Sequence, residues 1–129
     1  MTFFPTILAI GVGATIGASA RYYLTLLMNT TFGSAFPYGT LSANVVGSFL
    51  AGILLALILK IELGETYRLL LLVGMTGSLT TMSTLSLESV EMISLGHYGQ
   101  ASLNILLNVF LSLAAAGVGV ALARYLFSN

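Results

Sequence analysis

The sequence predicts an all-α membrane protein with four transmembrane helices, and its composition and length support this fold class. Of the 129 residues, 57% are hydrophobic and 6% are charged, with a mean hydropathy of +1.03. A soluble domain of this size needs more polar residues to cover its surface. A transmembrane helix takes ~20 residues, because each residue rises ~1.5 Å across ~30 Å of hydrocarbon. We therefore expect a single four-helix domain over residues 1–129, in contact with the lipid bilayer.

Charge and cysteine content exclude several classes of function. The net charge is zero and the four basic residues are scattered along the chain, which argues against a nucleic-acid interface. The absence of cysteine excludes disulfides, thiolate catalysis and cysteine-based metal sites. The single histidine, His97, has no partners at the spacing of a metal site or a catalytic triad. The sequence therefore gives no basis for an enzyme.

The four predicted spans are apolar runs separated by turn signals. The first run begins without the basic segment of a cleavable signal peptide, so we interpret it as a span. It contains Gly13 and Gly17, a spacing that allows two helices to pack closely. Glycine, proline and polar residues mark the links between spans. The spans are predicted at residues 4–28, 41–60, 67–95 and 100–126, with links at 29–40, 61–66 and 96–99.

The basic residues favour cytoplasmic termini without excluding the opposite orientation. Four spans place both termini on one side of the membrane. Lys60, Arg68 and Arg124 are near that side, whereas only Arg21 is toward the other. The positive-inside rule favours this arrangement, although so few charges also allow insertion in both orientations.

The third predicted span is interrupted near its middle by glycine and hydroxyl side chains. Seven serine or threonine residues lie between Thr76 and Ser86. Unsatisfied backbone groups are costly in hydrocarbon, so such a stretch is tolerated where it is buried in protein or lines a wet cavity. We predict a helix broken near its middle, with carbonyl oxygens suited to a small cation and a helix N-terminus suited to an anion. The alternative is a kinked helix whose hydroxyls bond to its own carbonyls.

A second polar feature lies on one face of the last span. Asn104, Asn108 and Ser112 recur at i, i+4 and i+8, and Asn44 of the second span is a fourth polar residue. Amides and hydroxyls donate to an anion without holding it as tightly as a fixed cation does. The pattern predicts an uncharged anion pathway, but it also fits water or a small polar solute.

Three charged residues, Arg21, Glu88 and Glu91, are expected within or near the membrane. Charges at such positions are functional candidates. The alternative is that their side chains extend to the membrane interface.

Two motifs resemble those of the Fluc (CrcB-type) fluoride channel family. They read Gly39-Thr40-Leu41-x-x-Asn44-x-x-Gly47 and Gly77-x-Leu79-Thr80-Thr81-x-Ser83-Thr84-x-Ser86-x-Glu88. The chain length, the four spans and the glycine-rich first span agree with the family as well. The resemblance implies a passive fluoride channel that exports fluoride and relieves its toxicity. It also implies an antiparallel, dual-topology dimer with two pores in the bacterial inner membrane, and a structural sodium ion at the dimer centre.

The resemblance implies roles for individual residues. Backbone carbonyls at Gly77 and Thr80 would hold the sodium ion. Glu88 would lie near the pore mouth, and Arg21 would supply a charge in the vestibule. The residues implied for the fluoride pore are Thr40, Asn44, Met82, Ser83, Thr84, Leu85, Glu88, Asn104, Asn108 and Ser112.

Met82 and Leu85 depart from the family pattern. The family carries phenylalanines at these positions, whose electropositive ring edges contact the anion. Methionine is polarisable and leucine keeps the pocket apolar, but neither offers such an edge. The chain would then be a working variant that forms a homodimer, an engineered variant, or a subunit that pairs with a paralogous partner in a heterodimer.

A small proton-coupled multidrug exporter is the alternative function, because such exporters also have four spans and often dual topology. That mechanism requires a carboxylate deep in the first span. The acidic residues of this chain all lie elsewhere, at Glu62, Glu65, Glu88 and Glu91. A membrane scaffold without transport would need only the small-residue faces. The sequence favours the fluoride channel.

Overall fold

The predicted four-helix membrane fold is confirmed. The computed structural model describes residues 3–61 and 64–127, and every regular element in these ranges is a helix. Four helical stretches are long and apolar enough to span a membrane. They are α1 (Phe3–Phe32), α2 (Tyr38–Ile61), a third span composed of α3 (Glu65–Tyr67), the π-helix η1 (Arg68–Thr76), α4 (Gly77–Leu79) and α5 (Met82–Ser94), and α6 (Tyr98–Leu126).

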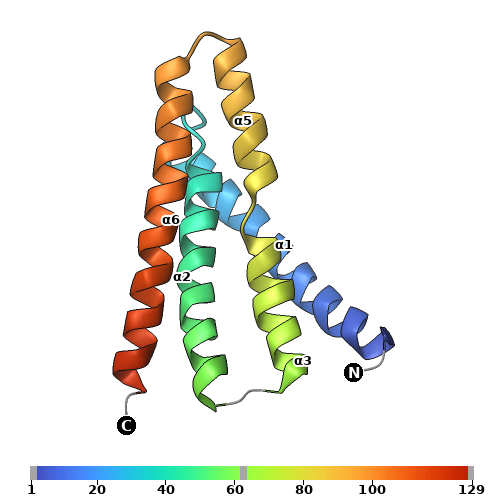
Figure 1. The fold of residues 1–129 in the computed structure, drawn as a ribbon. Helices are drawn as coiled ribbons and strands as arrows, with labels where there is room; N and C mark the ends of the chain where they lie inside the picture. The colour runs from blue at the N-terminus through green and yellow to red at the C-terminus, as the bar shows by residue number, and fades with distance from the viewer. Residues whose placement is uncertain (1–2, 62–63, 128–129) are drawn as a thin grey trace.

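The spans form an up-and-down bundle in which α1 lies oblique to the others. Figure 1 shows α2 and α6 side by side over most of their length, with α5 beside the first half of α6. α1 crosses the bundle and packs mainly on η1, α4 and α2. The first turn of α1 and the last turn of α6 lie at the same end (Figure 1), as an even number of spans requires.

The helices are longer than predicted around the first link. The sequence predicts a link over residues 29–40, but α1 continues to Phe32 and α2 already begins at Tyr38. The hydroxyls of Thr30 and Thr31 donate to the carbonyl of Leu27 at 2.9 and 2.8 Å, so these polar side chains are accommodated within the helix. The helix ends at Gly33, whose φ of 77° favours glycine.

The other boundaries differ by a few residues. The third span covers Glu65–Ser94 in place of residues 67–95, and α6 begins at Tyr98 in place of residue 100. Gly96, with φ 80°, makes the turn between them. Part of the predicted link at 61–66, including Glu62, lies outside the described residues.

Glycines bring α1 into backbone contact with the third span. A Cβ on Gly13 would clash with the carbonyl of Leu70, and a Cβ on Gly17 would clash with the carbonyl of Met75. The predicted packing role of this glycine pair is therefore confirmed.

Replacing Gly17 by alanine should destabilise the fold, because the added methyl group must separate α1 from the backbone of η1. Overpacking of this kind costs ~1–3 kcal/mol. Thermal unfolding followed by circular dichroism checks this. Gly11→Ala is the matched control, since nothing lies within 4 Å of a Cβ at Gly11; equal losses in both variants would contradict the packing argument.

The third span is non-helical between Leu79, where α4 ends, and Met82, where α5 begins. Thr80 has φ −78° and ψ 155°, and Thr81 has φ −152° and ψ 113°, both extended conformations. The Thr81 hydroxyl caps α5 by accepting from the N–H of Thr84 at 3.2 Å. Hydroxyls that bond to their own helix also occur, for example from Thr76 to the carbonyl of Leu72 at 2.6 Å. The extended segment at Thr80 and Thr81 is the feature around which the candidate site is built.

Candidate functional site

Asn44 of α2 holds the extended segment in place. Its Oδ1 accepts from the N–H of Thr81 at 2.6 Å, and its Nδ2 donates to the carbonyl of Thr81 at 3.2 Å. Both residues are buried. The side-chain amide thus replaces the helical partners that the Thr81 backbone lacks. Buried backbone groups require hydrogen-bond partners, and Asn44 supplies them to Thr81 from a neighbouring span.

The predicted asparagine face of α6 continues this network. Asn44 Nδ2 also donates to Asn108 Oδ1 at 2.8 Å. Asn108 Nδ2 donates to both the carbonyl and Oδ1 of Asn104, each at 2.9 Å. Asn104, which is fully buried, donates to Ser89 Oγ of α5 at 3.3 Å. A buried chain of hydrogen bonds therefore links α2, α5 and α6 to Thr81.

This network gives the amides of Asn44 and Asn108 partners within the protein. The sequence predicts that these amides donate to an anion, and this stays a prediction; in this structure both N–H groups of Asn44 and of Asn108 donate to protein oxygens. Each side-chain amide has two such groups, so neither residue has a donor left over. In this structure these two asparagines position the extended segment. Ser89, which the sequence analysis did not single out, is the last member of this hydrogen-bond network.

Ser112 is the member of the α6 polar face whose hydroxyl remains available. Its Oγ is buried and has no hydrogen-bond partner among the described residues. It borders a recess of about 370 Å³, the Ser112 recess, which Asn44, Thr81, Met82 and Leu85 also line. The two departures from the family pattern differ in exposure, because Met82 is 69% exposed whereas Leu85 is 3% exposed. A free hydroxyl in a mainly apolar recess is a suitable donor for a small solute.

A second recess, the Arg21 recess, lies on another side of the extended segment. Its volume is about 380 Å³. It is lined by Ala18, Arg21, Tyr22, Thr25, Thr40, Thr81, Thr84 and Glu88. Arg21 Nη1 donates to the carbonyl of Thr80 at 3.4 Å, so this cation contacts the interruption directly. Arg21 and Glu88 thus border one recess, and the vestibule role that the resemblance implies for Arg21 stays a prediction.

The hydroxyls of Ser83 and Thr84 gather around Thr81. Thr81 Oγ1 lies 3.2 Å from Ser83 Oγ and 2.9 Å from Thr84 Oγ1. Together with the Thr84 N–H, these contacts fix the first turn of α5. Thr84 also borders the Arg21 recess, whereas Ser83 is exposed.

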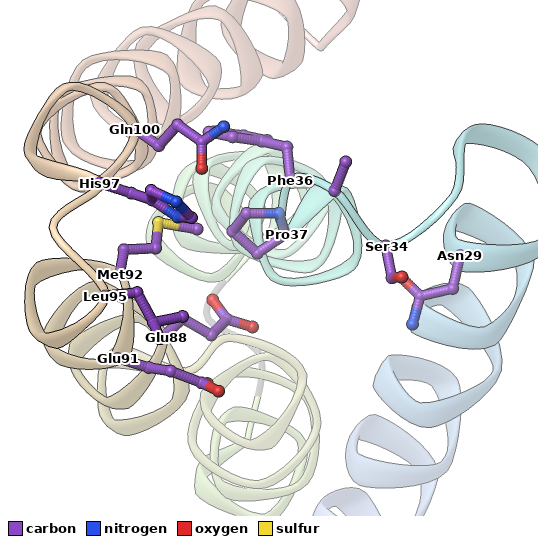
Figure 2. Close-up of a pocket in the computed structure, with 11 residues that line it drawn as sticks. Asn29, Ser34, Phe36, Pro37, Glu88, Glu91, Met92, Leu95, His97 and Gln100 are labelled. Carbon is purple, nitrogen blue, oxygen red and sulfur yellow. The ribbon is translucent and has the colours of Figure 1, made fainter.

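Glu88 connects the Arg21 recess with a third hollow, the turn recess, at the end of the bundle. The turn recess, of about 300 Å³, lies between the α1–α2 link and the α5–α6 turn. Figure 2 shows the Glu88 carboxylate pointing toward Pro37, with Glu91, His97 and Gln100 around the rim. Thr40 Oγ1 donates to Glu88 Oε1 at 2.5 Å, while Glu88 Oε2 is buried without a partner among the described residues.

Replacing Thr40 by valine should destabilise the protein, because it removes the donor to a largely enclosed carboxylate. Hydrogen bonds to charged groups contribute ~1.5–3 kcal/mol, and Thr40 is 3% exposed. The melting temperature in detergent checks this. Thr15→Val is the control, since the Thr15 hydroxyl is exposed and bonds only to the carbonyl of Gly11. An unchanged melting temperature for Thr40→Val would show that Thr40 does not support Glu88.

The carbonyls of Gly77 and Thr80 lack their usual helical donors. In a continuous helix they would accept from the N–H groups of Thr81 and Thr84. Those groups bond instead to Asn44 Oδ1 and Thr81 Oγ1. Two backbone oxygens are therefore free of helical bonds at the interruption, and oxygens of unwound helices are suitable ligands for Na⁺.

Comparison with known proteins identifies the family. The chain matches the family model described as CrcB-like protein, Camphor Resistance (CrcB), over residues 8–120. The chain belongs to the CrcB family. This confirms the resemblance drawn from the two motifs.

Curated relatives of this CrcB-family chain carry the name fluoride-specific ion channel FluC. The protein of Roseiflexus sp. (strain RS-1) is 41% identical over 121 residues, covering 93% of this chain and 98% of the relative. The protein of Coxiella burnetii (strain Dugway 5J108-111) is 43% identical over 122 residues, covering 93% and 98%. That of Vibrio parahaemolyticus serotype O3:K6 (strain RIMD 2210633) is 44% identical over 111 residues, covering 85% and 87%.

Proposed function

We propose that this CrcB-family chain is a fluoride-selective, passive ion channel that exports fluoride from the cell and relieves its toxicity. The observation that carries the proposal is the extended segment at Thr80 and Thr81, which Asn44 holds against two recesses with few fixed charges. The names of the relatives support fluoride as the ion. The proposed location is the inner (plasma) membrane of a bacterium, with four spans crossing the bilayer.

Uncharged donors suit conduction of a small anion. A fixed cation at mid-membrane would bind fluoride too tightly for rapid release. In the Ser112 recess the Ser112 hydroxyl is free to donate, and in the Arg21 recess the Thr84 hydroxyl is at the wall. We assign fluoride contact to these hydroxyls and a positioning role to the buried amides of Asn44 and Asn108.

The proposal includes an antiparallel, dual-topology dimer. A single subunit leaves both recesses open at its surface, and Met82 beside the Ser112 recess is 69% exposed. A second subunit against this face would enclose the pathway and exclude lipid from it. The partner is a second copy of this chain or a paralogous subunit that supplies the aromatic groups missing at Met82 and Leu85.

A structural sodium ion at the dimer centre fits the carbonyls of Gly77 and Thr80, which lack helical donors. When bound, it would neutralise backbone oxygens that the interruption leaves without helical donors. One subunit offers two such oxygens, so a symmetric partner would double the number of ligands. The residues of this chain contribute by keeping the segment extended, through the bonds from Asn44 and Thr81.

The proton-coupled multidrug exporter has no corresponding support. α1 carries no acidic residue, so the carboxylate that such a mechanism requires is missing from the first span. The comparisons likewise offer no exporter among the relatives described.

Ion efflux from liposomes tests the proposed function. Vesicles containing the purified chain and loaded with fluoride should release it rapidly to a fluoride electrode, whereas chloride-loaded vesicles should retain chloride. Equal release of both ions would contradict selectivity. Flux from the chain alone would exclude obligate hetero-pairing. Fluoride flux that requires co-purification with a paralogue would establish obligate hetero-pairing. The absence of fluoride flux from both preparations would contradict a channel function.

A further inference from the structure

A hollow between α2 and α6 lies at the end of the bundle that carries the termini, away from the extended segment. Its volume is about 340 Å³. Its walls include the apolar side chains of Leu57, Leu59 and Phe127, and two cations, Lys60 and Arg124, border it. We call it the terminal hollow. The proposed fluoride pathway uses none of these residues.

The terminal hollow follows from the way α2 and α6 pack. A Cβ on Gly52 would clash with the carbonyl of Ala116, and a Cβ on Gly119 would clash with that of Phe49, so the two backbones touch there. One helical turn beyond each glycine, the facing residue is Ala56 on α2 and Ala123 on α6. Both alanines line the terminal hollow. Figure 1 shows the two ribbons spreading apart beyond the contact, toward the C-terminus.

Both cations lie at the ends of predicted membrane-spanning helices, where basic side chains meet lipid headgroups. Lys60 is in the last turn of α2 and Arg124 is in the last turn of α6, and both side chains are exposed. Long basic side chains at the ends of spans extend toward the headgroups. The partial negative charge of the two helix C-termini opposes an anion there, but it amounts to about half a charge per helix against a full charge on each side chain.

Arg68, the remaining cation at this end among the described residues, does not line the terminal hollow. Two cations therefore converge over apolar walls at one place only among the described residues, and that combination matches an amphiphilic anion.

We propose that the terminal hollow binds an anionic phospholipid, with its phosphate between Lys60 and Arg124 and its acyl chain along Leu57, Leu59 and Phe127. A zwitterionic lipid brings a cation beside its phosphate, which weakens its attraction to two basic side chains. A free phosphate ion has the charge but gains nothing from the apolar walls. The proposal does not depend on fluoride transport.

Native mass spectrometry of the purified full chain tests the proposal. The protein receives phosphatidylglycerol or phosphatidylcholine with identical acyl chains, and a third sample receives inorganic phosphate. The wild type should retain phosphatidylglycerol preferentially. Lys60→Gln and Arg124→Gln should each reduce this preference about fivefold, and the double variant about 25-fold, given the typical attraction of one basic residue to an anionic membrane.

Two further variants separate a site from general charge. Ala56→Phe fills the terminal hollow while keeping both cations, and it should also reduce phosphatidylglycerol retention. Arg68→Gln removes a cation at the same end and should leave retention unchanged. Wild-type retention by the double variant, an equal loss in Arg68→Gln, or displacement of the lipid by equimolar inorganic phosphate would each overturn the proposal. Helical circular dichroism and thermal unfolding of each variant establish that it is folded.

Discussion

Replacing Asn44 by leucine is expected to abolish fluoride flux. Leucine has a similar size, but it leaves the N–H and the carbonyl of Thr81 without partners, together with Asn108 Oδ1. Each buried unsatisfied group costs ~1–3 kcal/mol. The extended segment should therefore lose its geometry, and the melting temperature should fall as well. Fluoride-electrode measurements on proteoliposomes, with thermal unfolding in parallel, check both effects.

Ser86→Ala is the control for this experiment. Ser86 lies on α5, in the same span as the extended segment, but its exposed hydroxyl bonds only to the carbonyl of Met82, one helical turn away. Its flux and stability should remain close to those of the wild type. Wild-type flux in Asn44→Leu would contradict the positioning role that we assign to the amide.

Removing sodium is expected to lower fluoride flux about tenfold or more, because a carbonyl left without its ligand inside the proposed dimer costs ~1–3 kcal/mol and 1.4 kcal/mol corresponds to a factor of ten. The carbonyls of Gly77 and Thr80 are the groups concerned, since their helical donors bond elsewhere. The measurement compares efflux with sodium and with N-methylglucamine on both sides of the vesicle.

Restoring sodium should restore both flux and melting temperature. Arg21 already contacts the Thr80 carbonyl at 3.4 Å, and this contact offers a partial substitute for a cation. If flux and stability are indifferent to sodium, Arg21 is a sufficient partner and no cation is needed at these oxygens.

The sequence predicted the four spans because long apolar runs have one stable form in a bilayer. It did not predict where α1 ends, since Thr30 and Thr31 have the composition of a loop but bond back to Leu27. The π-helix η1 also carries no sequence signal. Its wider turns face Gly13 and Gly17 of α1, so its shape depends on packing between spans that are distant in sequence.

The sequence predicted residues of the candidate site, but it did not predict the hydrogen bonds between them. Helical spacing placed Asn104, Asn108 and Ser112 on one face. Spacing could not reveal that the amides of Asn44 and Asn108 donate to protein atoms, because that depends on how α2 and α6 are apposed. Ser89 was missed for the same reason, since a serine on α5 has no distinguishing pattern until α6 lies beside it.

We propose that the extended segment and the two recesses beside it conduct fluoride in preference to chloride. The most direct measurement is the reversal potential across a planar bilayer that contains the chain, with fluoride on one side and chloride on the other. We predict a reversal potential governed by the fluoride gradient alone. A reversal potential near zero, or one governed by chloride, would contradict it.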